Sequence, residues 1–132
     1  MTKKVYMNKL GKKAKEASLY LSSINNEKKN SVLKKFSYYI RKNENLILRE
    51  NKKDINNAKK NGTKINMIDR LILNNNKLKQ IQNSIKEIIR FRDPVGKILS
   101  TWKRPNGLII KKISTPIGTI GVIYESRPNV TS

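Results

Sequence analysis

The sequence predicts an α/β fold, and three observations support this prediction. In the first part of the chain, apolar residues recur at three- and four-residue spacing, which is the period of amphipathic helices. Beyond Pro94, two short apolar runs flank a Pro-Asn-Gly turn, which is typical of a β-hairpin. The run 117–124 is apolar and β-branched except at Thr119 and Gly121, which indicates a strand buried on both faces in a parallel sheet. We therefore expect helices, a hairpin and the first strand of a sheet that is incomplete in this chain.

Two amphipathic helices are expected first, and ordinary core packing is the simplest reading of their apolar stripes. The first helix ends near Ser22, and its stripe is Met7, Leu10, Ala14, Ala17 and Leu21. Asn25 or Asn26 can cap the second helix, with Glu27 favourably placed in the first turn. The stripe of this second helix is Val32, Leu33, Phe36, Tyr39, Ile40 and Ile47. Asn43 interrupts that stripe and predicts a bend or a boundary.

Three further helices complete the helical part. A short helix passes through Ile55 and Ala58 and stops at Asn61-Gly62, a pair suited to a left-handed cap. Another short apolar helix covers 67–72, before the polar break 74–76. The clearest amphipathic helix then ends before Asp93-Pro94, and its stripe is Leu78, Ile81, Ile85, Ile88 and Ile89.

Asp69-Arg70 is the polar pair to note among these helices. Adjacent residues on a helix do not face each other, so the two side chains cannot form an ion pair within the helix. A surface or capping role is therefore expected for them.

The hairpin is expected from two strand-like runs, 95–102 and 108–113, joined by the turn 103–107. Trp102 ends the first run. Its large ring can pack on its own chain.

The charge of the chain allows two interpretations. Thirty Lys and Arg against nine Asp and Glu give a formal net charge of +21, which would suit a polyanion such as nucleic acid or an acidic membrane. Lys, Asn and Ile dominate the composition, however, and nucleotide bias toward their codons would also raise the charge. The lysines are scattered and the few aromatic residues form no stacking pattern. Nucleic acid is therefore not the expected partner.

Several classes of site are excluded by composition. The sequence has no cysteine and no histidine, so it offers no disulfide, no thiolate or imidazole metal ligand and no histidine base. We expect no metal cofactor. No stretch has the apolar length of a signal peptide or a membrane span, so the expected setting is the cytoplasm, without a membrane partner.

The predicted strand and the turn that follows it carry a family resemblance. Pro116-x-Gly118-x-x-Gly121-Val-Ile-Tyr-Glu-Ser-Arg-Pro-Asn-Val-Thr131 resembles the gamma-glutamyl phosphate reductase (glutamate-5-semialdehyde dehydrogenase) family of the aldehyde dehydrogenase superfamily. Met67-Ile-Asp-Arg-Leu71 and Asp93-Pro-Val-Gly96 resemble the same family in the same order. The resemblance covers this chain in outline and only the amino-terminal third of the family's length.

The resemblance implies a Rossmann-like cofactor domain and three parts of the chain. Residues 1–93 would be the amino-terminal helical part of that domain, 94–115 a β-hairpin arm for oligomerisation, and 116–132 the domain's first strand and turn, cut short. The full-length protein would be a homo-oligomer, and Trp102 of the arm would lie at an interface between subunits, unless it packs on its own chain.

The turn that follows the predicted strand is the candidate site, because open α/β sheets bind ligands at the carboxyl ends of their strands. By residue type, Asn129 can be a helix N-cap or can donate its amide to an oxyanion. The resemblance favours the oxyanion role in catalysis, and it places Glu125, Ser126, Arg127 and Pro128 beside the nicotinamide half of NADP. Arg127 can also bind a phosphate or carboxylate, or form a structural salt bridge.

The reaction that the resemblance implies is the NADPH-dependent reduction of L-glutamate 5-phosphate to L-glutamate 5-semialdehyde and phosphate in L-proline biosynthesis. It uses a cysteine nucleophile, which this sequence lacks. We therefore expect the 132 residues alone to be inactive. Two other interpretations stay open: a non-catalytic remnant of a truncated reading frame, and a basic nucleic-acid-binding module.

Overall fold

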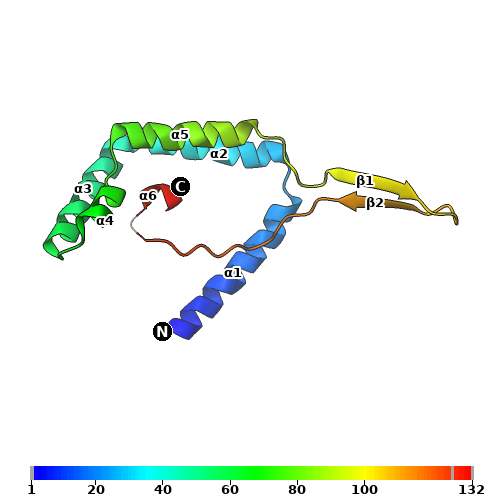
Figure 1. Cartoon of the computed structure of the whole chain (residues 1–132), viewed down its shortest axis with the longest axis horizontal. Coiled ribbons are helices and arrows are strands. Elements are labelled where there is room, and N and C mark those ends of the chain that lie inside the picture. The colour runs from blue at the N-terminus through cyan, green and yellow to red at the C-terminus, as the bar shows by residue number, and fades with distance from the viewer. Residues whose placement is uncertain (1, 126, 132) are drawn as a thin grey trace. The chain divides into compact units, whose positions relative to one another are not determined.

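The computed structural model describes residues 2–125 and 127–131. Helices form most of it, followed by a hairpin and a last short helix (Figure 1). The elements in order are α1 (Lys3–Ser23), α2 (Asn26–Lys42), α3 (Glu44–Lys60), α4 (Ile65–Leu71), α5 (Asn75–Arg90), β1 (Ile98–Lys103), β2 (Ile109–Ile113) and α6 (Pro128–Thr131). The predicted helices and hairpin are therefore confirmed.

The contacts within the chain divide it into two compact units. One unit joins Met1–Asn26 to Arg92–Gly121, and the other joins Glu27–Phe91 to Val122–Ser132. The family resemblance divides the chain into three parts by their expected roles, and the two units are defined by contacts. The three-part division therefore stays a prediction.

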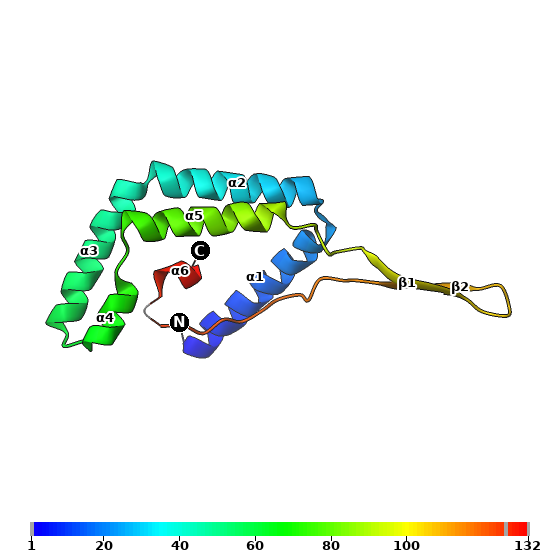
Figure 2. The same ribbon diagram turned by 45° about the horizontal axis from the view of Figure 1, so that its top comes forward.

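The second unit contains the hydrophobic core, which lies between α2 and α5. Ile40 of α2 packs with Leu78 and Ile85 of α5, and each of these side chains is buried. The two helices run side by side in Figure 2. Partly buried apolar side chains surround this cluster: Leu33, Ile47, Leu48, Leu73, Ile81 and Ile89. The stripe predicted on the last long helix is thus the centre of the core.

Asn43 forms the boundary expected in the second helical stretch. Its side-chain amide donates to the carbonyl oxygen of Tyr39 over 2.8 Å, at the end of α2. The chain then starts α3 at Glu44 and ends it before Gly62, whose φ of 69° favours glycine. The predicted stripe of α2 is buried only in part, because Phe36 and Tyr39 have no covering element among the described residues of this unit and remain exposed.

Asn51 fixes α3 to the loop between α4 and α5. Its amide nitrogen donates to the Leu71 carbonyl oxygen over 2.9 Å, and its amide oxygen accepts from the Leu73 N–H over 2.8 Å. The side chain is buried, and both of its polar atoms are paired, as burial requires. These two bonds hold in place the loop that carries Ile72 and Leu73, which line the candidate site.

The first unit includes α1. The apolar stripe of α1 was predicted to pack in a core, and this prediction is wrong. None of the described residues of α1 is buried, and Met7, Leu10 and Leu21 are exposed. The reason is that burial needs a covering layer. Within this unit, the Thr119 hydroxyl donates to the Ala14 carbonyl oxygen of α1 over 3.3 Å.

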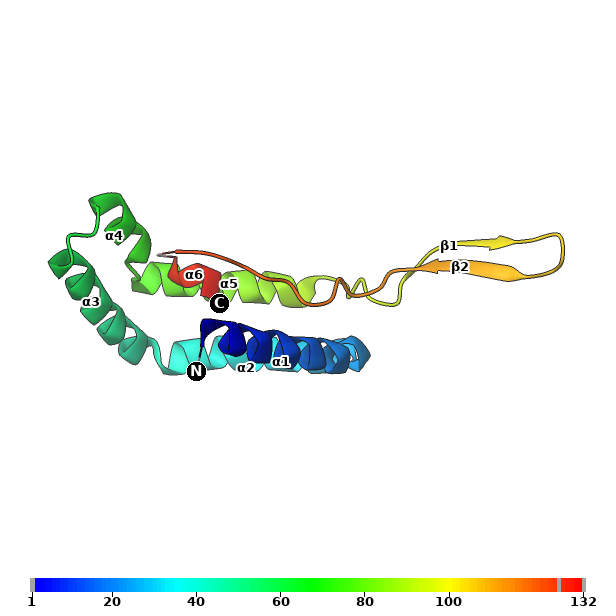
Figure 3. The same cartoon turned by 90° about the horizontal axis from the view of Figure 1, so that it is seen from below.

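The hairpin pairs β1 and β2 as an antiparallel ribbon (Figure 3). Its turn is closed by Arg104 and Leu108, and Gly107 adopts a φ of 85° there. Ser114 fastens the base: its hydroxyl donates to the Pro94 carbonyl oxygen, and its backbone N–H donates to the Lys97 carbonyl oxygen over 3.0 Å. Trp102 faces Ile110 in the register and is 44% exposed, so its predicted place at an interface stays a prediction.

The run 117–124 differs from its prediction as a buried strand. It is not part of a sheet, and Ile117, Ile120 and Ile123 are exposed. A strand is defined by ladder hydrogen bonds to a neighbour, and the only sheet among the described residues is the β1–β2 ribbon. The run therefore has the residues of a buried strand without the partners that would bury it.

Candidate functional site

The turn after residue 124 is closed by local interactions. Pro128 starts α6, where its fixed φ and missing N–H suit the first helical position. The Val130 N–H donates to the Arg127 carbonyl oxygen over 3.0 Å. The hydroxyl oxygens of Tyr124 and Thr131 lie 2.8 Å apart in a hydrogen bond that spans the turn. Together these bonds hold α6 as one helical turn.

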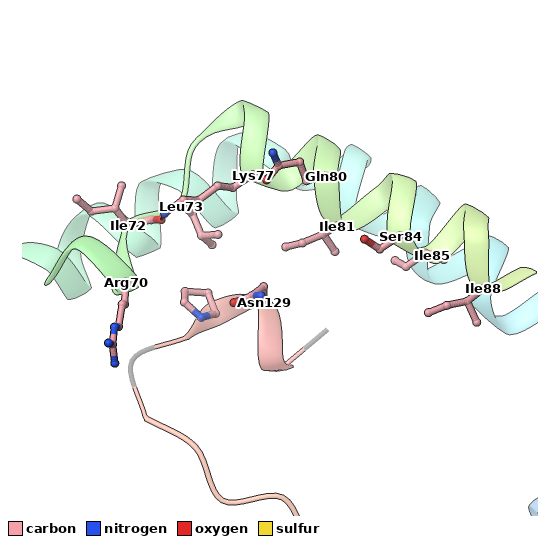
Figure 4. A pocket seen from close by; sticks show the side chains of 11 residues that line it. Arg70, Ile72, Leu73, Lys77, Gln80, Ile81, Ser84, Ile85, Ile88 and Asn129 are labelled. Atoms are coloured by element: carbon pink, nitrogen blue, oxygen red, sulfur yellow. Dashed lines mark hydrogen bonds between the residues drawn. The ribbon is translucent and has the colours of Figure 1, made fainter. Parts of the chain in front are cut away.

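A cavity of about 460 Å³ lies between α6 and the α4–α5 segment (Figure 4). Its lining combines apolar and polar side chains, both along α5 and from the segments opposite. The lining residues are Arg70, Ile72, Leu73, Lys77, Gln80, Ile81, Ser84, Ile85, Ile88, Pro128 and Asn129. Apolar walls with a few convergent polar groups are typical of small-molecule sites.

Asn129 is the predicted catalytic residue that the structure brings to this cavity. Figure 4 shows it on the α6 wall, opposite the side chains of α5. Because α6 begins at Pro128, Asn129 lies within the first turn of the helix and not at the N-cap that its residue type also allowed. Its amide group can donate a hydrogen bond to an oxygen in the cavity.

Only one of the predicted cofactor-binding residues that the structure describes lines the cavity. Pro128 lines the cavity, whereas Glu125 and Arg127 are exposed and do not belong to its lining. Ser126 lies outside the described residues. Three of these four predicted positions thus form an exposed turn and one wall of the cavity, and their roles toward a ligand stay predictions.

Lys77 and Asp69 fasten the opposite wall. The Lys77 ammonium donates to the Ile72 carbonyl oxygen over 2.6 Å and to the Asp69 carbonyl oxygen over 3.4 Å, at the end of α4. A cation at a helix C-terminus is favoured by the helix dipole. Lys77 thus caps α4 by donating to the Asp69 and Ile72 carbonyl oxygens, while Arg70 lines the cavity.

Polar residues of α5 were missed by the sequence analysis. Lys77, Gln80 and Ser84 recur at spacings of three and four, so they share a face beside the apolar stripe of Ile81 and Ile85. This periodicity was available as a signal. Only the position of α6, however, identifies the face as the wall of a cavity.

The part of the chain that the structure describes contains no group of three or more acidic, His or Cys side chains that could hold a metal ion. Within the same residues, no helix combines the length and the apolar character needed to cross a membrane.

The chain is similar in sequence to gamma-glutamyl phosphate reductases. It is 48% identical over 120 residues to that of Caldicellulosiruptor bescii, which covers 91% of this chain and 29% of the relative. It is 44% identical over 122 residues to that of Carboxydothermus hydrogenoformans, with 92% and 29% covered. The chain therefore spans less than one third of the length of these relatives. No protein-family model matches it.

Solved structures give the same result. The crystal structure of gamma-glutamyl phosphate reductase from Thermotoga maritima superimposes with a TM-score of 0.86 at 38% identity, covering 91% of this chain and 29% of that one. The enzyme from Saccharomyces cerevisiae gives a TM-score of 0.87 at 31% identity, with 93% and 31% covered. The resemblance read from the sequence, and its restriction to an amino-terminal third, are confirmed.

Proposed function

This chain is homologous to the amino-terminal third of the gamma-glutamyl phosphate reductases, and we propose that it forms part of an NADPH-dependent enzyme of L-proline biosynthesis. The reaction would reduce L-glutamate 5-phosphate to L-glutamate 5-semialdehyde and phosphate. The observation that carries the proposal is 41–49% identity over most of this chain to relatives that bear the reductase name.

Asn129 is proposed as the donor to the oxygen that becomes negatively charged during the reaction. Its place on the wall of the cavity supports this role, because a donor that is already oriented toward developing negative charge stabilises that charge. Loss of one such donor costs about 3 kcal/mol in the barrier, or about a hundredfold in rate. Asn129 would polarise the acyl group, and the nucleophile would come from residues that this sequence does not contain.

The turn is proposed to border the nicotinamide half of NADP. Glu125 and Arg127 fit this role in being exposed, so that a ligand can reach their backbone and side chains. The guanidinium of Arg127 would suit a phosphate oxygen. The cofactor supplies a hydride when bound, and these residues would serve to hold and orient it. The preference for NADP over NAD is part of the proposal.

The remaining expectations follow from the proposed reaction. Its substrate is a small molecule, its setting is the cytoplasm, and the complete protein is expected to be a homo-oligomer with no membrane partner. The nucleophilic cysteine is not among the 132 residues, so we expect the chain alone to give no turnover.

The mass and activity of the native polypeptide test this function. An antibody against residues 1–100 would recover the polypeptide from its source cells, and its oxidation of NADPH would be followed with L-glutamate 5-phosphate. We expect a species of roughly three times 15.3 kDa that turns over.

A species of 15.3 kDa without turnover would overturn the enzyme reading in favour of a remnant. Binding of the same species to nucleic acid, steeply weakened by salt but still selective for sequence or structure, would favour the basic module instead. NADH used as efficiently as NADPH would overturn the cofactor assignment alone.

A further inference from the structure

Two asparagines of the chain are followed directly by glycine: Asn61 precedes Gly62, and Asn106 precedes Gly107. An Asn-Gly pair can modify itself, because glycine has no side chain to shield its nitrogen and has the most mobile backbone. The glycine nitrogen attacks the carbonyl carbon of the asparagine side chain, Cγ, and closes a succinimide ring. Both asparagines are exposed, so water can reach both.

Crowding does not distinguish the two pairs. A methyl group built on Gly62 or on Gly107 would meet no atom within 4 Å. Both glycines also have a positive φ, of 69° and 85° respectively. Neither glycine is therefore packed against a neighbouring group, and the difference between the pairs lies in the hydrogen bonds that hold them.

Asn61 is held in a helix cap that keeps its side chain from the nitrogen of Gly62. At the end of α3, the Gly62 N–H donates to the Lys59 carbonyl oxygen over 3.1 Å. The Thr63 N–H donates to the Ala58 carbonyl oxygen over 3.0 Å, which completes a Schellman motif. The ψ of Asn61 is 9°, so the Gly62 nitrogen nearly eclipses the backbone nitrogen of Asn61 and lies away from its Cβ. Ring closure therefore requires rotation about the Cα–C bond and loss of the cap.

Asn106 lies in the turn at the end of the β1–β2 ribbon (Figure 3). Its side-chain oxygen accepts from the Leu108 N–H over 3.2 Å, so the side chain runs along the intervening Gly107 peptide. This bond keeps Cγ next to the peptide whose nitrogen must attack it. It also polarises the side-chain carbonyl group and makes Cγ more electrophilic.

The turn around Asn106 has little to hold it closed. The Gly107 N–H donates to the Arg104 carbonyl oxygen over 2.9 Å, and this bond must open before the nitrogen can attack. Residues 101–109 are all exposed. A two-stranded ribbon is only marginally stable in water, and exposed hydrogen bonds with few apolar contacts open at low free energy. The turn therefore opens more often than the cap of α3, a helix that Asn51 ties to the loop after α4.

We infer that Asn106 is a site of spontaneous deamidation and that Asn61 is protected by its helix cap. The Gly107 nitrogen gives its proton to hydroxide and bonds to Cγ of Asn106. The Cγ–Nδ2 bond breaks, and ammonia leaves with a proton taken from water. A second water molecule then opens the succinimide. Its attack at Cγ gives aspartate, and its attack at the backbone carbonyl carbon gives isoaspartate.

Either product changes the turn of the ribbon. A carboxylate replaces the neutral amide, so the formal net charge of +21 falls by one. In isoaspartate the main chain passes through Cβ and Cγ of residue 106, which lengthens the turn by one methylene group. The oxygen that accepted from the Leu108 N–H then belongs to the main chain. This modification does not depend on the proposed reaction.

Incubation of the 132-residue chain in dilute neutral buffer tests the assignment. Trypsin cuts after lysine and arginine but not before proline, so peptide 61–64 reports on Asn61 and peptide 104–111 reports on Asn106. Mass spectrometry measures the conversion in each peptide, and incubation in water enriched in heavy oxygen marks the molecules that reacted before digestion. We expect Asn106 to convert at least about tenfold faster than Asn61, because its turn opens more readily.

Two controls separate the fold from the local sequence. In urea both pairs are unfolded and should convert at similar rates, since glycine follows each asparagine. Asn106→Gln would need a larger ring, so it should abolish conversion in peptide 104–111 and leave the rate at Asn61 unchanged. Hydrogen exchange measures the two openings directly, and the Gly107 amide should exchange faster than the Gly62 amide.

Several results would overturn the assignment. They are no conversion at Asn106, conversion at Asn61 that is as fast or faster in the folded chain, and slower exchange at Gly107 than at Gly62. A preference for Asn106 that persists unchanged in urea would overturn it as well, because neighbouring residues and not the fold would then set the rate.

Discussion

The hydroxyl oxygens of Tyr124 and Thr131 lie 2.8 Å apart, and their hydrogen bond closes the turn that carries Asn129. Tyr124 precedes the turn and Thr131 ends α6, so one bond ties the entry of the turn to the last residue of its helix. A helix of four residues cannot hold itself in water. The orientation of Asn129 therefore depends on this closure and on the contacts of the cavity.

Tyr124→Phe should loosen the turn without disturbing the core. The substitution removes one hydrogen bond, worth about 1 kcal/mol, between exposed groups. We expect increased backbone mobility from 127 to 131 in 15N relaxation measurements and no change at Leu78. Tyr38→Phe, which removes a hydroxyl from an equally exposed tyrosine, is the control. Equal mobility in the two variants would contradict the role given to the Tyr124 hydroxyl.

Asn51→Ala should destabilise the second unit. The change removes two hydrogen bonds and leaves the N–H of Leu73 without its acceptor, at a cost of about 1–3 kcal/mol. Urea unfolding followed by circular dichroism measures the loss. Asn56→Ala, at an exposed position of the same helix, should change stability by less than about 0.5 kcal/mol. A similar midpoint for both variants would show that the Asn51 bonds contribute nothing.

The same substitution at two glycines should have opposite effects. Gly62 has a φ of 69°, so Gly62→Ala should cost about 1 kcal/mol in strain. Gly11 lies inside α1, and a methyl group there would meet no atom within 4 Å. Gly11→Ala should raise helix stability by about 1 kcal/mol. Thermal unfolding of both variants measures the change in Tm. A change of the same sign in both variants would contradict the prediction.

The pKa of Glu50 should lie below its usual value. The hydrogen bond from the Lys53 ammonium, at 2.8 Å, is the main cause, and the bond from Arg49 adds to it. Because the pKa is depressed in the folded state, the stabilising effect is present above the usual carboxyl pKa of about 4.3 and is lost as pH falls through the folded value.

A titration of the Glu50 carboxyl by NMR measures this pKa. Lys53→Ala should raise it toward the usual value, whereas Lys52→Ala, an exposed neighbour on the same helix, should change it little. An unchanged pKa in Lys53→Ala would remove Lys53 as the cause. The Glu50 side chain is about half exposed, so solvent screens the interaction and the effect on overall stability is small.

The isolated chain should aggregate through residues 117–124. These residues are apolar, β-branched and without a sheet partner among the described residues, which are the conditions for edge-to-edge pairing. Ile123→Lys should lower light scattering on concentration, because a charge within the run opposes its pairing. Asn56→Lys adds the same charge elsewhere and should leave scattering high. A cooperative thermal transition without aggregation in the unaltered chain would refute this expectation.

The local structure of this protein could be predicted from its residues alone because the signals are local. Spacing of apolar residues located the helices, Asn43 and Asn61-Gly62 marked their ends, and Pro-Asn-Gly located the hairpin turn. Each of these features depends on dihedral preferences and side-chain periodicity within a few neighbouring residues. The family resemblance likewise depended on a short string of residue types.

Burial and the composition of the site depended on tertiary contacts. The stripes of α1 and α5 look alike as patterns, yet only that of α5 supplies buried core residues, because α2 covers it and no described element covers α1 in its unit. The run 117–124 has the composition of a buried strand and stays exposed for the same reason. Arg70 and Asn129 are 59 positions apart in the sequence (129 − 70), and only the folded chain brings them to one cavity.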